Sequence, residues 1–373
     1  MDIMKILKRA WAILWKYRAL WVFGFILALT VGGSATGRIG GNSGYRFNQR
    51  NIDPNSSTFP YDWKTFRDPA QVLETMRDTA TRLMEGSLPR SELNILLGVG
   101  IAFTVMVLLA SLLMTFLRYI SETAVIRMVA DSETTGEKVS VRQGFRLGWS
   151  PASWRLFLID LLVNGVPGLI LFILLGLITW GFVVQAIAAA HISQAIFSLA
   201  VLAGLAFLLI LVFSLYFLMV RVFIPFFRRA CVLENLGVSE SIRRGFALVR
   251  LHWQNVGLFW LVMIGLGIAW WVVSFILLFI LIPIFIATVV LAALVAGVPG
   301  LLAGWISSLF VGNPWPLIIG ILFGLPVFIP LAISPWFFFE GLVQVFASTS
   351  WTLAYRELTA LQTRPEILPP PAS

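Results

Sequence analysis

The sequence has almost none of the residues that build disulfides and metal clusters. Its 373 residues include one cysteine, Cys231, and two histidines, His191 and His252. One cysteine excludes an internal disulfide, and these three residues cannot supply the four Cys or His ligands of a structural zinc site. The Walker, G-x-S-x-G, H-E-x-x-H and C-x-x-C motifs are also absent. We therefore expect no metal, no cofactor and no enzymatic activity, and we interpret His191 as an interfacial side chain.

Charge is scarce as well. Charged residues make up 12% of the chain and hydrophobic residues 59%, whereas about a quarter of a soluble domain is charged. No Asp, Glu, Lys or Arg occurs from Leu161 to Val220, and none from Leu251 to Phe339. A membrane-spanning helix needs about 20 apolar residues, so each stretch exceeds one span. Because backbone in lipid must satisfy its own hydrogen bonds, the sequence predicts an all-α polytopic transmembrane helical bundle.

The apolar runs predict about six spans within a single membrane domain, residues 1–361. These are Ala19–Val31, Leu93–Leu117, Leu156–Thr179, Ala195–Ile224, Asn255–Leu281 and Leu317–Phe339. Pro283 is expected to end or kink the fifth. The apolar residues 284–311 are interrupted by Gly297 to Gly300 and leave two alternatives, a further span or two short re-entrant helices. A cleaved signal peptide is the alternative to the first span. We expect an extracytoplasmic loop at 32–92 and a disordered tail at 362–373.

A polar segment recurs between the spans. Shifting the segment that starts at Arg228 back by 101 residues aligns eight identities over 22 positions, with the pattern R-x5-E-x2-G-x3-S-x-R-x-G-F-x-L. In the second copy, Ile242, Phe246, Val249 and Trp253 form an apolar stripe at helical spacing. Such self-similarity indicates an internal repeat. It predicts three pseudo-repeats, about 1–135, 136–236 and 237–361, each an amphipathic helix followed by two spans.

Positive charge predicts the orientation in the cytoplasmic membrane. Lys and Arg number five at the N-terminus, six in the 118–155 linker and six in the 221–250 linker, and the connections 180–195 and 282–316 have none. Because Lys and Arg concentrate in cytoplasmic loops, both termini and both linkers are expected in the cytoplasm. The net charge of +9 thus reflects membrane topology, and no nucleic-acid partner is expected. The candidate contacts to anionic lipid are Lys5, Lys8, Arg9, Arg142, Arg146, Arg243, Arg244 and Arg250.

Asp160 is the one acidic residue within the predicted spans, where burial of a charge is expensive. With Asn164 it forms an i, i+4 polar strip, a possible intramembrane polar site for a proton or a cation. The alternative is an ion pair with Arg118, Arg155 or Arg221. Two further carboxylates are expected to pair within their linkers. These pairs are Glu133 with Arg127, and Glu234 with Arg228 or Arg229.

Two segments resemble a known family. VSVRQGFRLGWSPASWRLFLIDLL and GVSESIRRGFALVRLHWQNVGLFWLV are similar to the membrane domain fused to some bacterial glycerophosphodiester phosphodiesterases, and to related stand-alone six-span bacterial proteins. The catalytic barrel of such fusions is absent, so the resemblance implies a multi-pass membrane protein and no hydrolase activity. We therefore expect a protein that binds lipid or other membrane proteins through basic cytoplasmic helices. The alternative is a transporter or channel with a path between the repeats.

Overall fold

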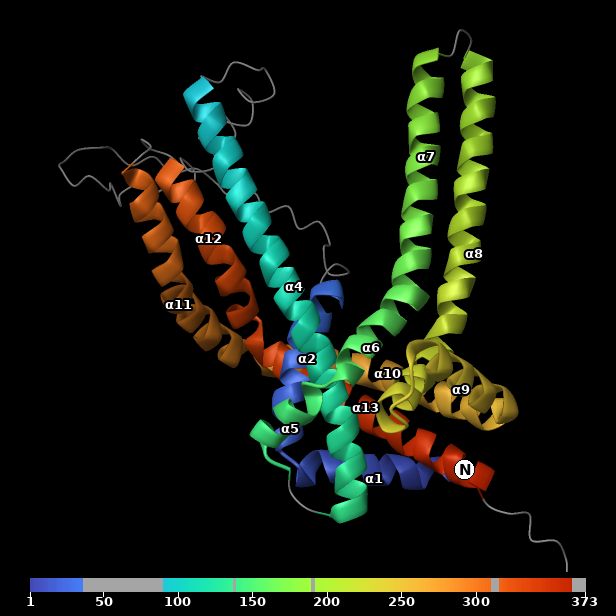
Figure 1. Ribbon diagram of the computed structural model, residues 1–373. Coiled ribbons are helices and arrows are strands. Elements are labelled where there is room, and N and C mark those ends of the chain that lie inside the picture. Colours follow the sequence, from blue (N-terminus) through green and yellow to red (C-terminus); the bar gives the residue numbers. More distant parts are fainter. Residues whose placement is uncertain (36–89, 137–138, 189–191, 310–314, 364–373) are drawn as a thin grey trace, which may run out of the picture. The chain divides into compact units, whose positions relative to one another are not determined.

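A computed structural model describes residues 1–35, 90–136, 139–188, 192–309 and 315–363. Every element in these ranges is a helix, and they contain no strand, which confirms the all-α prediction. The helices are shown in Figure 1. They are α1 (Ile3–Lys16), α2 (Ala19–Ala35), α4 (Arg90–Thr135), α5 (Val141–Gly148), α6 (Pro151–Asp160), the π-helical turn η3 (Leu161–Gly165), α7 (Val166–Ala188), α8 (Ile192–Leu233), α9 (Val238–Leu251), α10 (Trp253–Ile280), α11 (Ile282–Ser308), α12 (Trp315–Ala332) and α13 (Ser334–Thr363). Residues 36–89 of the predicted loop, His191 and residues 364–373 lie outside the described residues.

Six helical segments are long and apolar enough to cross a membrane. They are Leu97–Thr135, Pro151–Gln185, Ile196–Leu233, Trp253–Ile280, Ile282–Ser308 and Trp315–Ala332. The predicted number of spans is confirmed, but the segments that form them differ from those predicted. Residues 284–308 of the stretch left open at 284–311 belong to one continuous helix, α11, that passes through Pro299. The predicted first span counts only if α1 and α2, which meet at a 101° bend, form one broken span.

The described residues form two compact units. Unit 1 takes its residues from 1–27, 117–272 and 340–363, and unit 2 from 28–116 and 273–339. These boundaries are not those of the three predicted pseudo-repeats, which remain a prediction. Unit 1 contains the short helices α1, α5 and α9 and most of the charged residues, so the candidate site lies there.

In unit 1 the short helices pack on long ones through glycine. A Cβ on Gly245 of α9 would lie 2.6 Å from the Phe227 ring, and a Cβ on Gly148 of α5 would lie 2.4 Å from the Ile120 carbonyl oxygen. Phe227 is near the end of α8 and Ile120 is in the second half of α4. Glycine permits such close approach because it has no side chain. Helices α5 and α9 are thereby each fixed against the long helix that precedes them.

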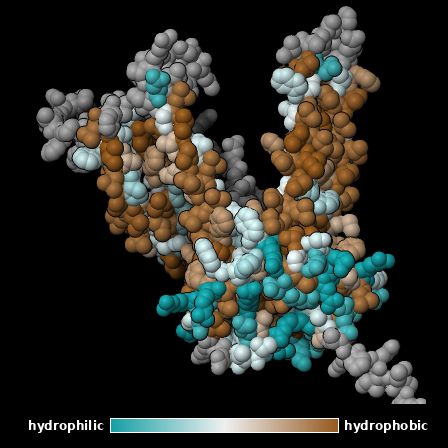
Figure 2. All heavy atoms as spheres, viewed as in Figure 1, coloured by the Kyte–Doolittle hydropathy of each residue, from teal (hydrophilic) through white to brown (hydrophobic). Residues whose placement is uncertain are grey.

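The antiparallel pair α7 and α8 is one apolar part of unit 1. Its surface is hydrophobic in Figure 2, while hydrophilic atoms gather over the end of the unit that holds the short helices. The Tyr216 hydroxyl of α8 donates a hydrogen bond of 2.8 Å to the Val163 carbonyl in η3. In unit 2, α11 and α12 also pack through glycine, because a Cβ on Gly300 would lie 2.9 Å from the Gly320 carbonyl oxygen.

Candidate functional site

Asp160 ends α6 and lies at the centre of a group of polar side chains from three helices. Its Oδ1 accepts hydrogen bonds from Asn164 Nδ2 at 2.7 Å and from Arg228 Nη2 at 3.0 Å. Its Oδ2 accepts a bond from the Tyr119 hydroxyl at 2.7 Å and lies 3.6 Å from Arg118 Nη2. The structure thus brings Asp160 and Asn164 together and gives Asp160 one of its three predicted arginine partners, Arg118.

Arg228 extends the group to a second carboxylate. Its Nη1 donates to both oxygens of Glu122, at 2.7 and 2.9 Å. Glu122 is 7% exposed, so this charge-assisted pair is largely shielded from water. We call Arg118, Glu122, Asp160 and Arg228 the ion-pair network. It joins α4, α6 and α8 at the level where their apolar segments meet the polar end of unit 1.

Both Asp160 oxygens are occupied in this arrangement, which limits what the carboxylate can do chemically. A metal ion or a transported cation would have to displace Arg228 or Tyr119 from it. The π-helical turn that follows is a feature often found at functional sites. Here one carbonyl of the turn, that of Val163, receives the Tyr216 hydroxyl. The geometry supports a structural role for Asp160, and a proton or cation site there stays a prediction.

Arg229 is buried beside this network without a direct ion pair, although the Glu122 carboxylate acts on its charge from nearby. It is 4% exposed and makes no ion pair with any described residue. Its guanidinium donates to the Pro225 carbonyl at 3.0 Å and to the carbonyl and hydroxyl of Ser348 at 3.2 and 3.1 Å. Oxygen dipoles therefore stabilise this charge and tie α8 to α13.

Two sequence-based ion-pair predictions are wrong, those for Glu133 and for Glu234. Glu133 pairs with Arg9 of α1 and not with Arg127, which donates to the Leu147 carbonyl at 3.1 Å. Six residues separate Arg127 from Glu133, and this spacing places them on different faces of α4. Arg155 likewise does not reach Asp160, because it donates to the Asn235 carbonyl at 2.9 Å.

Glu234 also has partners other than the predicted ones. Its carboxylate accepts hydrogen bonds from Arg244 Nε at 3.3 Å and from the Tyr355 hydroxyl. Arg228 instead donates to Asp160, and Arg229 donates to Ser348. Burial, together with the hydrogen bond to Glu234, raises the pKa of the Tyr355 hydroxyl above its usual value. The hydroxyl therefore remains a donor at neutral pH.

The Arg228–Glu122 pair was missed because its partners are 106 residues apart. The available signal was Glu122 itself, one turn beyond Arg118 on the same face of α4.

The short helices carry exposed faces on which basic and aromatic side chains alternate. We call these the basic–aromatic faces. On α5 the face contains Arg142, Arg146 and the adjoining Trp149, which is 78% exposed. The α1 face contains Met4, Lys8, Trp11 and Trp15, and the α9 face contains Arg243, Phe246, Arg250 and the adjoining Trp253.

The structure separates the eight predicted lipid contacts into two groups. Lys5 and Arg9 line a cavity, and Arg244 is paired with Glu234. The other five are exposed and make no ion pair among the residues described, namely Lys8, Arg142, Arg146, Arg243 and Arg250.

The described residues contain no group of three or more His, Cys, Asp or Glu that could hold a metal ion. Cys231 is buried and unpaired.

The sequence matches the model of a family of unknown function, DUF7544, over residues 7–349. The chain belongs to this family. The match includes the ion-pair network, α5 and α9, so these features lie in the DUF7544 region. No curated protein and no solved structure matches the chain. Nothing in the DUF7544 match links it to the membrane domains of glycerophosphodiester phosphodiesterases, and that resemblance remains a prediction.

Proposed function

We propose that this multi-pass membrane protein is non-enzymatic and binds anionic lipid headgroups with the basic–aromatic faces of α1, α5 and α9. The observation that carries this proposal is the shared composition of the three faces. Each places Trp or Phe beside Lys or Arg on the exposed side of a short helix. Tryptophan is enriched at membrane–water interfaces, and basic residues near the cytoplasmic leaflet are attracted to anionic lipid by about 1 kcal/mol each.

Helical spacing supports the assignment for α9. Arg243, Phe246 and Arg250 follow at i, i+3 and i+7 and lie on one side. The buried side of the same helix consists of Ser241, Gly245, Leu248 and Val249. The protein therefore covers one side of α9 and leaves Arg243 and Arg250 exposed, while Phe246 is about half-exposed and stacks on Phe223 of α8. On α5, Gly144 and Gly148 are buried and Arg142 and Arg146 are exposed.

Contacts within unit 1 support a common side for the termini and linkers. The Asp2 amide donates to Glu357 at 3.1 Å, which joins the start of α1 to the end of α13. Arg9 pairs with Glu133 at the end of α4, and the Tyr355 hydroxyl donates to Glu234 just after α8. Segments in contact at a polar end lie on the same side of a membrane. We therefore propose that both termini and both linkers are cytoplasmic. This requires an even number of crossings in each interval, so α2 would cross as well as α4, and one of α10, α11 and α12 would not cross fully.

The proposal is tested by the lipid preference of the full-length protein. The protein is reconstituted in phosphatidylcholine, and electron spin resonance compares the association of nitroxide-labelled phosphatidylglycerol and phosphatidylcholine with its surface. We expect a preference for phosphatidylglycerol that falls when Lys8, Arg142, Arg146, Arg243 and Arg250 are all replaced by glutamine.

The matched comparison removes two charges in each variant. Arg243→Gln with Arg250→Gln is expected to lower the preference, whereas Lys5→Gln with Arg356→Gln is expected to leave it close to the wild-type value, because these two side chains line a cavity. Equal losses in the two variants would mean that only net charge matters, and the proposal would fail.

Transport along a path beside Asp160 is the less well supported alternative. Both of its carboxylate oxygens accept hydrogen bonds, from Asn164, Arg228 and Tyr119. A path would require this network to open.

A further inference from the structure

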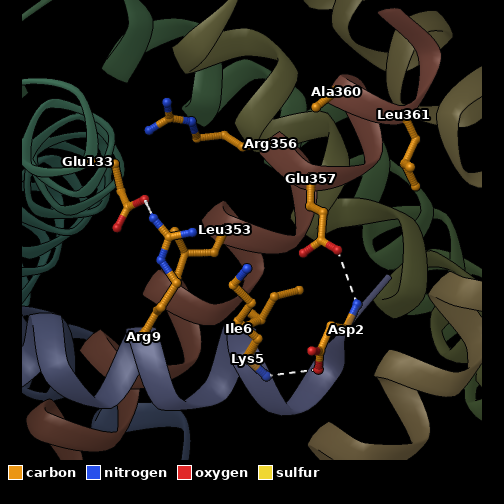
Figure 3. A pocket seen from close by; sticks show the side chains of 10 residues that line it. All are labelled: Asp2, Lys5, Ile6, Arg9, Glu133, Leu353, Arg356, Glu357, Ala360 and Leu361. Atoms are coloured by element: carbon orange, nitrogen blue, oxygen red, sulfur yellow. Dashed lines mark hydrogen bonds and ion pairs between the residues drawn. The ribbon is translucent and has the colours of Figure 1, made fainter. Parts of the chain in front are cut away.

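A cavity of about 590 Å³ lies between α1, the end of α4 and the second half of α13. Figure 3 shows charged side chains from all three helices around it. They are Asp2, Lys5, Arg9, Glu133, Arg356 and Glu357, and apolar Ile6, Leu353, Ala360 and Leu361 complete the lining. Small-molecule sites typically measure about 300–1,000 Å³ and combine apolar walls with a few polar groups. The size therefore fits a small ligand, and the many charged side chains of the lining favour a charged one.

Two cationic groups of the cavity have no carboxylate partner. Arg9 is paired with Glu133. Lys5 is exposed and makes no ion pair with a described residue. Arg356 donates Nη1 to the Ala130 carbonyl at 3.1 Å and makes no ion pair in the described part of the chain either. An anionic group in the cavity would therefore find an ammonium and a guanidinium that the protein itself does not neutralise.

Two carboxylates of the cavity are only half used. Asp2 accepts the Lys5 amide on Oδ1 at 3.1 Å and so caps the start of α1. Glu357 accepts the Asp2 amide on Oε1 at 3.1 Å. The second oxygen of each carboxylate receives no hydrogen bond from a described residue. An ammonium group could bind these oxygens, whereas a ligand with several negative charges would be repelled by them.

The cavity and the basic–aromatic face are on different sides of α1. Lys5 and Arg9 follow each other at i, i+4 on the cavity side, while Met4, Trp11 and Trp15 follow at i, i+7 and i+11 on the other. A helix that places its tryptophans on lipid turns its cavity side toward water. The ligand is therefore expected to come from solution.

From this geometry we infer that the cavity binds a small soluble zwitterion, a compound with a carboxylate or phosphate group close to an ammonium group. The anionic group contacts Lys5 and Arg356. The ammonium group contacts Glu357 and Asp2, and an apolar substituent packs on Ile6 and Leu353. The soluble origin of this ligand rests on the proposed lipid contact of α1, whereas the charges that line the cavity do not, so zwitterion binding and lipid preference can each fail without the other.

Isothermal titration of the purified full-length protein tests the inference with four compounds. L-Leucine is a zwitterion with a carboxylate, and O-phosphoethanolamine is a zwitterion with a phosphate. 4-Methylpentanoate corresponds to leucine without its ammonium group, and isopentylamine corresponds to leucine without its carboxylate. We expect one of the zwitterions to bind at least about tenfold more tightly than either single-charge compound, which corresponds to about 1.4 kcal/mol. No binding by either zwitterion, or equal binding by the single-charge compounds, contradicts the inference.

Substitutions locate the binding. Lys5→Met removes an exposed, unpaired ammonium, so the fold should not change, and zwitterion affinity should fall about tenfold or more. Lys8→Met is the control, because Lys8 is on the same helix but outside the cavity lining. Glu357→Gln should reduce the ratio of the affinity for leucine to the affinity for 4-methylpentanoate, because it removes a carboxylate that contacts the ammonium group of leucine. Wild-type affinity in Lys5→Met, or an equal loss in Lys8→Met, would place the ligand elsewhere and overturn the assignment.

Discussion

Replacing Asp160 by asparagine removes one negative charge from the ion-pair network and preserves the size of the side chain. The new amide nitrogen cannot accept the bond that one carboxylate oxygen now receives from Tyr119 or from Arg228. Arg118 also loses its only ion-pair partner in the described structure. Arg228 keeps its ion pair with Glu122, whose two oxygens are the closest acceptors of the Arg228 guanidinium.

The expected loss of stability follows from these contacts. Breaking a buried ion pair by removing one partner typically costs about 3–5 kcal/mol. Arg228 retains one of its two carboxylates, so the charge is not left fully unpaired. A charge-assisted hydrogen bond contributes about 1.5–3 kcal/mol. We therefore expect Asp160→Asn to lower the free energy of unfolding by about 2–4 kcal/mol.

The assay is unfolding of the full-length protein in mixed micelles, titrated with sodium dodecyl sulfate and followed by tryptophan fluorescence. The control is Asp131→Asn on α4. Asp131 is partly exposed and makes no ion pair with a described residue, so its substitution should change stability by less than about 0.5 kcal/mol. An Asp160→Asn protein as stable as the control would refute the structural role. Wild-type stability with lost ion flux in vesicles would instead favour transport.

Three further substitutions test the packing of unit 1. Gly245→Ala should lower the free energy of unfolding by about 1–3 kcal/mol, since its Cβ would lie 2.6 Å from the Phe227 ring and 3.0 Å from the Phe227 amide nitrogen. The control is Gly257→Ala, which has nothing within 4 Å of its Cβ and should be neutral or stabilising by up to about 1 kcal/mol. Equal effects of the two substitutions would argue against the α8–α9 contact. Tyr355→Phe should cost about 1 kcal/mol at neutral pH, where the raised pKa keeps the hydroxyl protonated, and no loss would question the bond to Glu234. Arg228→Lys should destabilise the protein, because one ammonium cannot reproduce the planar contacts to Glu122 and Asp160, and a neutral result would contradict the network geometry.

The sequence was sufficient for the class of fold and for the helix beginnings that local chemistry determines. Long apolar runs predicted membrane-spanning helices, and the break at Leu281 lies two residues before Pro283, which was expected to end or kink a span. Ser140 caps α5 through a reciprocal bond with Gln143. The equivalent Ser241 is inside the first turn of α9, so the two copies of the repeated pattern begin their helices differently.

Periodicity was less informative about which side of a short helix is buried. The predicted stripe on α9 contained Phe246 and Trp253, which are 49% and 67% exposed, together with buried Val249. The buried side instead includes Ser241 and Gly245, because small residues allow α9 to approach α8 closely. A pattern of hydrophobic residues does not predict that a helix side made of glycine and serine is buried.

The ion pairs could not be predicted for a related reason. Asn164 was found from its i, i+4 spacing with Asp160, which is a local relationship. Arg228 reaches Glu122 only because α4, α6 and α8 converge, and that convergence depends on the packing of helices far apart in the sequence. Local spacing therefore identified one of the four Asp160 contacts, that of Asn164. Arg118 was among the predicted alternatives, whereas neither contact of Arg228 was predicted.

The membrane depth of α9 tests the account most directly. In a Cys231→Ala background, nitroxide labels are attached at Phe246→Cys, on the basic–aromatic face, and at Glu240→Cys, an exposed position on another side of the same helix. Accessibility to oxygen, which concentrates in lipid, is compared with accessibility to a water-soluble nickel complex in bilayers containing phosphatidylglycerol. The account predicts that the label at 246 is protected from nickel and exposed to oxygen, and that the label at 240 shows the reverse. Two labels equally accessible to nickel would show that α9 does not lie on the membrane, and the proposed lipid contact would be contradicted.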